Sequence, residues 1–388
     1  MTRFPTETLP YGVFSTPGTA PRVGVAVGDQ VLDLTTVQVD VPESTFAASS
    51  LNRFLALARP RWTSVRSAVA ELVADGAGTY VPQSEVILHM PVEVGDFVDF
   101  YSSINHATNV GRLFRPDSEP LLPNWRHLPV GYHGRSGTIV VSGTDIRRPD
   151  GQRRGEDGPV FGPSSALDFE LEVGFVTGNA NALGEPIPVE DAEEHIFGLC
   201  LVNDWSARDI QAWEYQPLGP FLGKSFATSI SPWIVPLEAL APYRVEPPPQ
   251  QPEVLPYLQT NGPTAIDLRL EVEIVPAGAS QGTVVTRNGF ADLYWTMSQQ
   301  LAHATVNGAN ARAGDLFSSG TVSGSEPGTL GSFLEITKNG TEPITLDDGS
   351  ERTYLEDGDT VILRGWCESA DGPRIEFGSC TGTVLPVR

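Results

Sequence analysis

The chain has 388 residues, of which 40% are hydrophobic and 19% are charged, and its formal net charge is −23. This length is enough for one large domain or for two or three smaller ones, each with a buried core. The strong negative charge argues against nucleic acid and anionic membrane as partners, because both would repel an acidic surface.

The sequence shows no membrane-span pattern, no signal-peptide pattern and no cysteine motif. No apolar run approaches the roughly 18 residues of a membrane span, and the N-terminal residues MTRFPTETLPYG lack the regions of a signal peptide. The three cysteines, Cys200, Cys367 and Cys380, form no spacing motif. We therefore expect reduced, buried thiols in a cytoplasmic protein.

The pattern of roughly the first 90 residues predicts a small β domain that also contains helices. Residues 12–36 have the alternating pattern of hairpins, broken at Gly28-Asp29, and residues 50–75 contain two segments with helical spacing. Strand character returns in residues 81–94. We expect an N-terminal domain over residues 1–90 and a second domain over residues 91–388.

The second domain is predicted to be mainly β, because its short strands are separated by frequent glycines and prolines. Two helices are expected within it, over residues 204–215 and 293–306. Residues 246–256, EPPPQQPEVLP, are expected to form an extended surface loop, since three consecutive prolines exclude a helix interior.

The predicted helix over 204–215 carries a polar stripe. Asp204, Arg208, Gln211 and Tyr215 recur at helical spacing and would share one face. Such a stripe is either a solvated surface or one wall of a site. The charge-poor segment that follows contains Lys224 alone, and a lysine fixed beside a site can stabilise a developing oxyanion, which favours the second interpretation.

The segment DFELEVGF, residues 168–175, places Asp168, Glu170 and Glu172 on alternate positions. On a strand these carboxylates share one face and repel one another, while the apolar residues between them pack on the other face. Oxygen ligands suit hard cations, so Mg²⁺ or Ca²⁺ would relieve the repulsion. We expect two or three of these carboxylates, with one or two acids from elsewhere in the chain, to form such a site.

Two histidine-containing stretches are further candidates for chemistry. His106 lies among polar residues in DFVDFYSSINHATNVGRLFR, and His127 and His133 flank Tyr132 on a predicted loop. Several other site classes are not supported. GPFLGKS is not a phosphate loop, because its glycines are one residue too close, and no G-x-S-x-G, H-E-x-x-H or C-x-x-C motif is present.

Five long segments carry a resemblance to a known family: DFYSSINHATNVGRLFR, LLPNWRHLPVGYHGRSGTIVVSGT, LDFELEVGF, NDWSARDIQAWEYQPLGPFLGKSFATSISPW and SSGTVSGSEPG. In this order, and from about residue 10 to the C-terminus, the chain resembles the fumarylacetoacetase family. The resemblance implies a small N-terminal SH3-like β-barrel followed by a large β-rich catalytic domain with a few helices. It also implies a homodimer that hydrolyses a carbon–carbon bond of 4-fumarylacetoacetate, a diketo acid. The products are fumarate and acetoacetate, in the last step of tyrosine and phenylalanine catabolism.

The resemblance also implies roles for single residues. Those that match the family's ligands for Mg²⁺ or Ca²⁺ are Asp99, Glu170, Glu172 and Asp204, with Lys224 and Thr228 in the same neighbourhood. His106 matches the general base, and Glu335 matches the acid that orients it. The oxyanion-stabilising group is matched by Arg208, Gln211 and Lys224. Substrate-binding positions are matched by Tyr101, Arg115, Tyr132, Gln211, Tyr215 and Thr321.

Two alternatives stay open at the level of the sequence. An acylpyruvate hydrolase, or an oxo-acid decarboxylase or isomerase, could share the same scaffold and the same metal carboxylates. An acidic β protein that binds Ca²⁺ for structural reasons would explain the acids, but it would leave Lys224 and His106 without a role.

Overall fold

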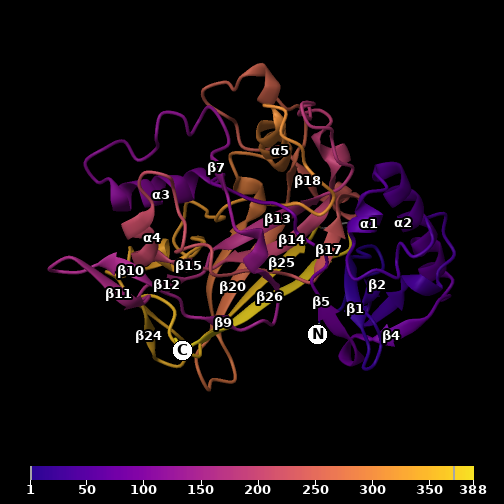
Figure 1. Cartoon of the computed structure of the whole chain (residues 1–388), viewed down its shortest axis with the longest axis horizontal. Helices are drawn as coiled ribbons and strands as arrows, with labels where there is room; N and C mark the ends of the chain where they lie inside the picture. The colour runs from indigo at the N-terminus through magenta and orange to yellow at the C-terminus, as the bar shows by residue number, and fades with distance from the viewer. Residues whose placement is uncertain (1, 370–371) are drawn as a thin grey trace.

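The computed structural model describes residues 2–369 and 372–388 and shows a mainly β chain with a few helices (Figure 1), which confirms the predicted fold class. The strands of its largest sheet are β1 (Tyr11–Ser15), β2 (Arg22–Val27), β3 (Gln30–Asp33), β4 (Tyr80–Pro82), β5 (Ile87–His89), β6 (Phe97–Phe100), β7 (Gly131–His133), β8 (Ile139–Val141), β13 (Leu171–Thr177), β14 (Ile196–Asp204), β16 (Thr228–Ile230), β17 (Trp233–Pro236) and β22 (Leu316–Ser318). The main path through this sheet runs β4-β3-β2-β1-β17-β14-β13-β22-β6-β7.

A second sheet lies against the middle of the first. Its strands, in spatial order, are β21 (Thr283–Gly289), β20 (Leu268–Val275), β25 (Thr360–Cys367), β26 (Ile375–Leu385) and β9 (Ile146–Arg147). Four short pairs complete the strands: β10 (Asp150–Arg154) with β11 (Pro159–Pro163), β12 (Leu167–Asp168) with β15 (Ser206–Ala207), β18 (Arg244–Val245) with β19 (Ala265–Ile266), and β23 (Ile344–Thr345) with β24 (Glu351–Arg352).

Six α-helices are found within the described residues: α1 (Asn52–Leu55), α2 (Arg59–Ala74), α3 (Ile104–Phe114), α4 (Arg208–Glu214), α5 (Met297–Thr305) and α6 (Phe333–Ile336). Figure 1 shows α1 and α2 beside the indigo N-terminal strands and α3 and α4 at the opposite side of the molecule. None of the helices in the described part of the chain has the length and apolar character needed to cross a membrane.

Strand β14 is buried along its whole length because it is packed on both faces. Its sequence IFGLCLVND is almost continuously apolar, as expected for a strand covered on two sides. Leu199 and Leu201 belong to the core shared with the second sheet, whereas Cys200 and Val202 belong to the core shared with the N-terminal strands. The N-terminal strands also continue the sheet itself, since β1 pairs with β17 through Tyr11 and Ile234.

The observed elements correct two of the predicted helices. The helix expected over 204–215 begins only at Arg208, because Asp204 is still the last residue of β14 and pairs with Thr228 of β16. The helix expected over 293–306 is α5, which begins after Thr296. The side chain of Thr296 caps the helix and forms a capping box with Gln299, and this fixes its start.

Other local predictions are confirmed. The hairpins expected over 12–36 are β1, β2 and β3, and Gly28 takes the positive φ of +60° that the turn requires. Helices α1 and α2 occupy the segment 50–75. Of the loop expected over 246–256, residues 246–255 contain neither helix nor strand, and Pro256 begins a short 3-10 helix, Pro256–Leu258.

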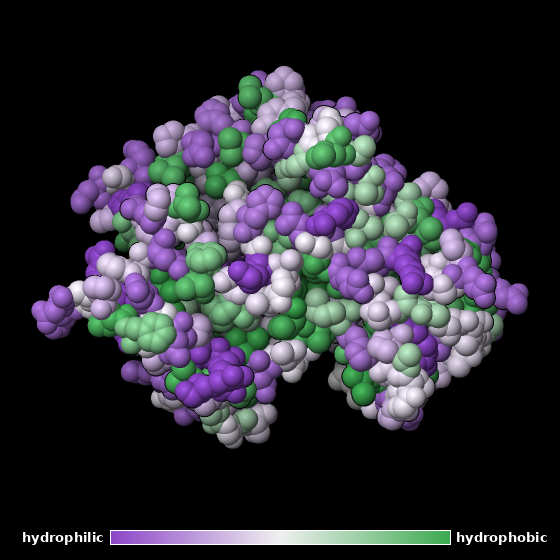
Figure 2. All heavy atoms as spheres, in the orientation of Figure 1, coloured by the Kyte–Doolittle hydropathy of each residue, from purple (hydrophilic) through white to green (hydrophobic). Residues whose placement is uncertain are grey.

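The surface of the molecule mixes polar and apolar residues. Figure 2 shows this for one face, on which a notch at the lower edge separates the N-terminal strands from the part that carries the C-terminus. A few apolar side chains are strongly exposed, among them Leu218 at 96% and Leu183 at 81%.

Leu201 tests the packing between the two sheets. It is fully buried, and a Cβ added at Gly365 of β25 would lie only 2.8 Å from its side chain. We expect Leu201→Ala to lower the free energy of unfolding by about 2–5 kcal/mol, since it leaves a cavity in a closely packed core. Urea unfolding followed by circular dichroism measures this. The exposed Leu218→Ala is the matched control and should leave the midpoint unchanged; equal effects of both would contradict the packing described.

Candidate active site

A cavity of about 470 Å³ lies between α3, α4 and the ends of β6, β7 and β13. One wall is apolar and includes Val110, Phe114, Leu121, Trp125 and Val130. The remaining lining contains most of the residues singled out from the sequence: Asp99, Tyr101, His106, Arg115, Tyr132, Glu170, Glu172, Arg208, Gln211, Tyr215, Lys224 and Thr321. Three further positions matched to the family lie behind this lining: Asp204 contacts Lys224, Glu335 contacts His106, and Thr228 contacts Asp204.

Four buried carboxylates meet at the floor of the cavity. One oxygen from each of Asp99, Glu170, Glu172 and Asp204 lies within 4.8 Å of the others, and all four residues are at most 4% exposed. The sheet brings them together. Asp204 lies on β14, Glu172 on β13 and Asp99 on β6, with β22 between β13 and β6, and Glu170 lies in the short link between β12 and β13.

Two buried cations partly neutralise this cluster. Lys224 Nζ forms ion pairs with Glu170 and with Asp204, and Thr228 Oγ1 donates to the second oxygen of Asp204 across 2.9 Å. Arg208 Nη1 donates to Glu170 across 2.7 Å. Burial alone would raise the pKa of Glu170, but Lys224 and Arg208 outweigh it and hold that pKa below its ordinary value.

Asp99 and Glu172 are not neutralised in the same way. Burial and the neighbouring carboxylates raise the pKa of both well above the ordinary range. Within the described residues no hydrogen-bond donor reaches Oδ1 of Asp99 or Oε1 of Glu172, although both atoms are buried. Buried carboxylate oxygens without partners, converging on one point, fit a hard divalent cation such as Mg²⁺ or Ca²⁺.

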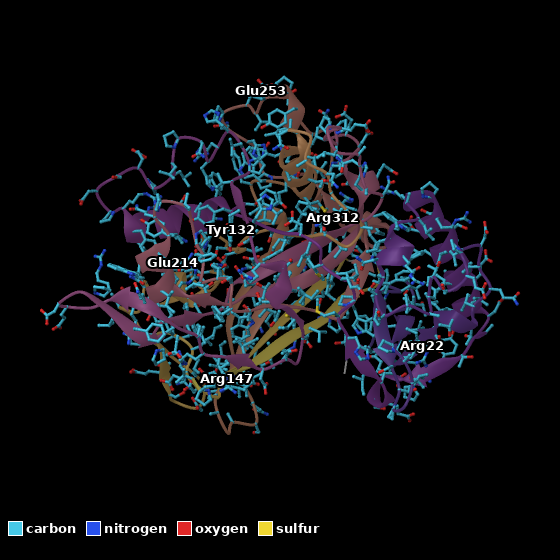
Figure 3. The ribbon with its side chains drawn as sticks, in the orientation of Figure 1. Arg22, Tyr132, Arg147, Glu214, Glu253 and Arg312 are labelled. Atoms are coloured by element: carbon cyan, nitrogen blue, oxygen red, sulfur yellow. The ribbon has the colours of Figure 1, made fainter. Side chains whose placement is uncertain are left out.

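The loop that carries Lys224 is fastened to α4. Glu214, the last residue of that helix, accepts hydrogen bonds from the backbone N–H groups of Phe221 and Gly223, at 2.9 and 2.7 Å. Figure 3 labels Glu214 and Tyr132 on the same side of the molecule. The Tyr132 hydroxyl donates to Asp204 across 3.4 Å, which ties β7 to the carboxylate cluster.

A histidine–glutamate pair lies beside the cluster. The Nδ1 atom of His106, on α3, is 2.7 Å from Oε2 of Glu335, and both residues are only 4% exposed. Burial opposes ionisation of Glu335, but His106 and the hydrogen bonds that the carboxylate accepts hold its pKa below the ordinary value. An ionised carboxylate only accepts, so Nδ1 carries the proton and Nε2 is the ring nitrogen left for chemistry.

Glu335 is itself held by residues that the sequence reading did not assign. Its carboxylate accepts from Asn109 Nδ2 at 2.9 Å, from Ser323 Oγ at 2.8 Å and from Ser332 Oγ at 3.1 Å. Asn109 lies one helical turn after His106, so helical spacing could have indicated it. Ser332 precedes Glu335 by three residues, the S-x-x-E spacing typical of a helix start, so local spacing could have indicated it as well. No local pattern relates Ser323 to Glu335.

Two guanidinium groups have unpaired nitrogens at the cavity. Arg115 Nη2 donates to the carbonyl of Pro120 across 2.8 Å, while its buried Nε has no partner among the described residues. Arg208 Nη2 is buried and unpaired in the same sense. Donors arranged in this way can bind the carboxylates or oxyanions of a small acidic molecule.

The strand expected over 168–175 is interrupted. Of its three acids, Glu170 and Glu172 belong to the carboxylate cluster and Asp168 does not. Strand pairing stops at Phe169 and Glu170, between β12 and β13. As expected, Phe169, Leu171 and Val173 pack into the core, whereas Asp168 lies outside the group of four carboxylates. The polar stripe predicted on one helix is likewise divided, since Asp204 belongs to β14 and only Arg208 and Gln211 lie on α4.

Comparison with known proteins gives matches along nearly the whole chain. The family model "Fumarylacetoacetase N-terminal" matches residues 7–91, and "Fumarylacetoacetate (FAA) hydrolase C-terminal" matches residues 97–385. The fumarylacetoacetases of Caenorhabditis elegans and Homo sapiens are 50% and 49% identical over 406 and 404 residues, covering 99% of this chain and 96% of each relative. The fumarylacetoacetase of Arabidopsis thaliana is 47% identical over 405 residues, with the same coverage.

Solved structures share the fold at lower identity. A fumarylacetoacetate hydrolase from Exiguobacterium antarcticum superposes with a TM-score of 0.60 at 17% identity, covering 98% of this chain and 100% of that one. A 5-carboxymethyl-2-hydroxymuconate delta-isomerase from Mycobacterium smegmatis gives a TM-score of 0.54 at 17% identity, covering 97% and 99%. Because the family model spans most of the chain and relatives near 50% identity cover almost all of it, the chain belongs to the fumarylacetoacetate hydrolase family.

Proposed function

We propose that this protein hydrolyses a carbon–carbon bond of 4-fumarylacetoacetate to give fumarate and acetoacetate, the last step of tyrosine and phenylalanine catabolism. The observation that carries the proposal is the cavity itself. It places the His106–Glu335 pair, the carboxylate cluster and the unpaired Arg208 Nη2 around one space. Identity of 47–50% to fumarylacetoacetases over nearly the full chain supports the same substrate.

The first chemical requirement is a nucleophile. Nε2 of His106 would accept a proton from a water molecule, whose oxygen then attacks the carbonyl carbon of the fumaryl group, at the bond that joins it to the acetoacetyl fragment. Glu335, ionised because its pKa is held below the ordinary value, keeps the ring in the correct tautomer and stabilises the imidazolium that forms.

The second requirement is a set of donors for the tetrahedral oxyanion that this attack creates. Arg208, Gln211 and Lys224 line the cavity on one side, and Arg208 Nη2 has no partner among the described residues. Fixed, buried donors need little reorganisation as negative charge develops, so they lower the barrier more than water would.

The third requirement concerns the leaving group. When the carbon–carbon bond breaks, its electron pair remains on the acetoacetyl fragment, which is a poor leaving group unless it is delocalised as an enolate. We infer that Asp99, Glu170, Glu172 and Asp204 hold Mg²⁺ or Ca²⁺, and such an ion would supply positive charge to the acetoacetyl oxygens. Arg115 and the tyrosines Tyr101, Tyr132 and Tyr215, with Thr321, would bind and orient the rest of the diketo acid.

The family likeness also supports a cytoplasmic homodimer and a division into domains over residues 1–90 and 91–388. We propose all three. Sedimentation equilibrium at several concentrations tests the dimer, whose mass would be twice that of one chain. Separate expression of the two segments tests the division, and the pairing of β1 with β17 predicts that the second segment is then less stable.

The substrate assignment is tested by mixing the purified protein with 4-fumarylacetoacetate and following its near-ultraviolet absorbance, with the products identified by chromatography. Acylpyruvates are assayed in parallel, because they are the substrates of the rival activity on this scaffold. Turnover of acylpyruvates alone would refute the assignment while leaving the fold and the family unchanged.

Metal removal should abolish turnover without unfolding the protein, because the apolar side chains between the two sheets stay packed and Lys224 and Arg208 still pair with Glu170 and Asp204. We expect activity to return when Mg²⁺ or Ca²⁺ is added to the chelated protein, and circular dichroism to stay constant throughout. A protein that unfolds on chelation would instead support a purely structural ion. Full activity after verified removal of metal would contradict the proposed role of the cluster.

His106→Ala should lower kcat by about 10²- to 10⁴-fold, the usual contribution of a general base. Metal affinity, measured by calorimetry, should be preserved, since His106 is not one of the converging carboxylates. His133→Ala is the matched control, because its side chain is 77% exposed and does not line the cavity. Near-normal turnover in His106→Ala would show that another group activates the water.

A further inference from the structure

We propose that Asp168 is a positioning residue that joins the oxyanion side of the active site to the base side. The inference rests on the proposed function for its kinetic consequences, although the coupling itself is structural. Asp168 is fully buried and does not line the cavity, so it cannot contact substrate. Its effect must pass through the groups that it holds.

The first of these groups is Arg208. Asp168 Oδ2 accepts a hydrogen bond from Arg208 Nε across 2.8 Å, and Glu170 accepts from Nη1 across 2.7 Å. A guanidinium is planar, so fixing two of its nitrogens fixes the third. Nη2 is the nitrogen left unpaired within the described residues. Asp168 therefore determines which edge of Arg208 is available to an oxyanion.

The second group is the start of α6. The backbone N–H of Phe333 donates to Asp168 Oδ1 across 2.8 Å, and that of Leu334 donates to Oδ2 across 2.9 Å. The residue that precedes the helix, Ser332, makes no side-chain cap. A carboxylate from a distant strand thus takes the place of the cap and neutralises the positive end of the helix.

Helix α6 carries Glu335, so the position of its first turn sets the position of that carboxylate. Glu335 is the residue directly after Leu334, and it holds His106 by the 2.7 Å contact to Nδ1. Behind the turn, the rings of Phe169 and Phe333 pack edge to face with centroids 5.0 Å apart, which keeps Asp168 and α6 in register.

One carboxylate therefore accepts from the guanidinium and from the helix that orients the base. It also accepts from the backbone N–H of Phe169 across 2.9 Å, so its acceptor sites are filled. Loss of the charge would leave these four donors competing for fewer acceptor sites. Arg208 and Glu335 would then shift together, although the two residues do not contact each other.

Asp168→Asn tests this coupling, because it keeps the shape and removes the charge. We expect kcat to fall by about 10²-fold, which is the usual effect of a displacement of about 1 Å in a catalytic group. KM should stay unchanged, since Asp168 does not line the cavity. Asp168→Glu, which keeps the charge beside Arg208 but not the geometry, should be less impaired and provides a second variant if the asparagine variant does not fold.

The matched control is Asp359→Asn. Asp359 is also fully buried, and it accepts from Arg352 Nε and Nη2, both at 2.9 Å, and from the backbone N–H of Glu356 at 2.9 Å. It is bound in the same manner as Asp168 but does not line the cavity. Its substitution should lower the melting temperature and leave kcat unchanged. An equal loss of kcat in both variants would reduce the role of Asp168 to stability and overturn the inference.

A readout that does not depend on turnover separates this inference from the proposed substrate. The readout is the resonance of the Nδ1–H proton of His106. It is to be recorded by nuclear magnetic resonance on the metal-loaded full chain with isotope-labelled histidine, and the resonance that disappears in His106→Ala identifies it. We expect Asp168→Asn to move this resonance and Asp359→Asn to leave it in place. An unmoved resonance in Asp168→Asn would overturn the inference. A moved resonance in a protein that does not hydrolyse fumarylacetoacetate would support the coupling and refute only the proposed substrate.

The double variant Asp168→Asn/Glu335→Gln gives a kinetic check on the same point. If Asp168 acts through Glu335, the combined loss of kcat is smaller than the product of the two single losses. Losses that multiply would show that Asp168 and Glu335 act independently, which contradicts the coupling.

Discussion

Five carboxylates are buried around one end of the central strands: Asp99, Asp168, Glu170, Glu172 and Asp204. Within the described part of the chain, the buried cations that pair with them are Arg208 and Lys224. Removing a charge from water is costly unless the charge is paired and hydrogen-bonded. The arrangement of the surrounding residues therefore depends on this excess of buried negative charge. Among the described residues, Asp99 and Glu172 each keep a buried oxygen without a partner, and a divalent cation would satisfy both.

The fold accommodates this excess of charge by spreading the acids over several elements and bringing cations to them from others. Strands β6, β13 and β14 belong to one sheet, with β22 between β6 and β13, and each supplies a carboxylate, while apolar side chains of the same strands pack into the core. Lys224 arrives on a loop that is held by Glu214, and Arg208 arrives on the first turn of α4. Rigid supports of this kind keep donors and ligands in place without reorganisation during a reaction.

The proposed chemistry needs two sides of the cavity: the side with His106 and Glu335, and the side formed by the sheet and α4. Water activation depends on His106 and Glu335, which come from α3 and α6, whereas stabilisation of charge depends on the sheet and α4. Asp168 is the structural link between these two sides, since its carboxylate binds Arg208 on one and the backbone of α6 on the other. A residue that never meets substrate can thus contribute to the geometry on which turnover depends.

The sequence by itself determined the features that depend on neighbouring residues: the N-terminal hairpins, the helices within 50–75 and the apolar side chains of residues 169–173, all of which follow from local periodicity. The same local pattern failed at Asp204, because pairing with β13 and β16 extends β14 through a segment whose spacing also suits a helix. Only the tertiary structure decided which acids converge and how Glu335 reaches His106, 229 positions away. Such contacts arise from the pairing of distant strands, which a local pattern does not encode, and from the sequence they could be named only through family resemblance.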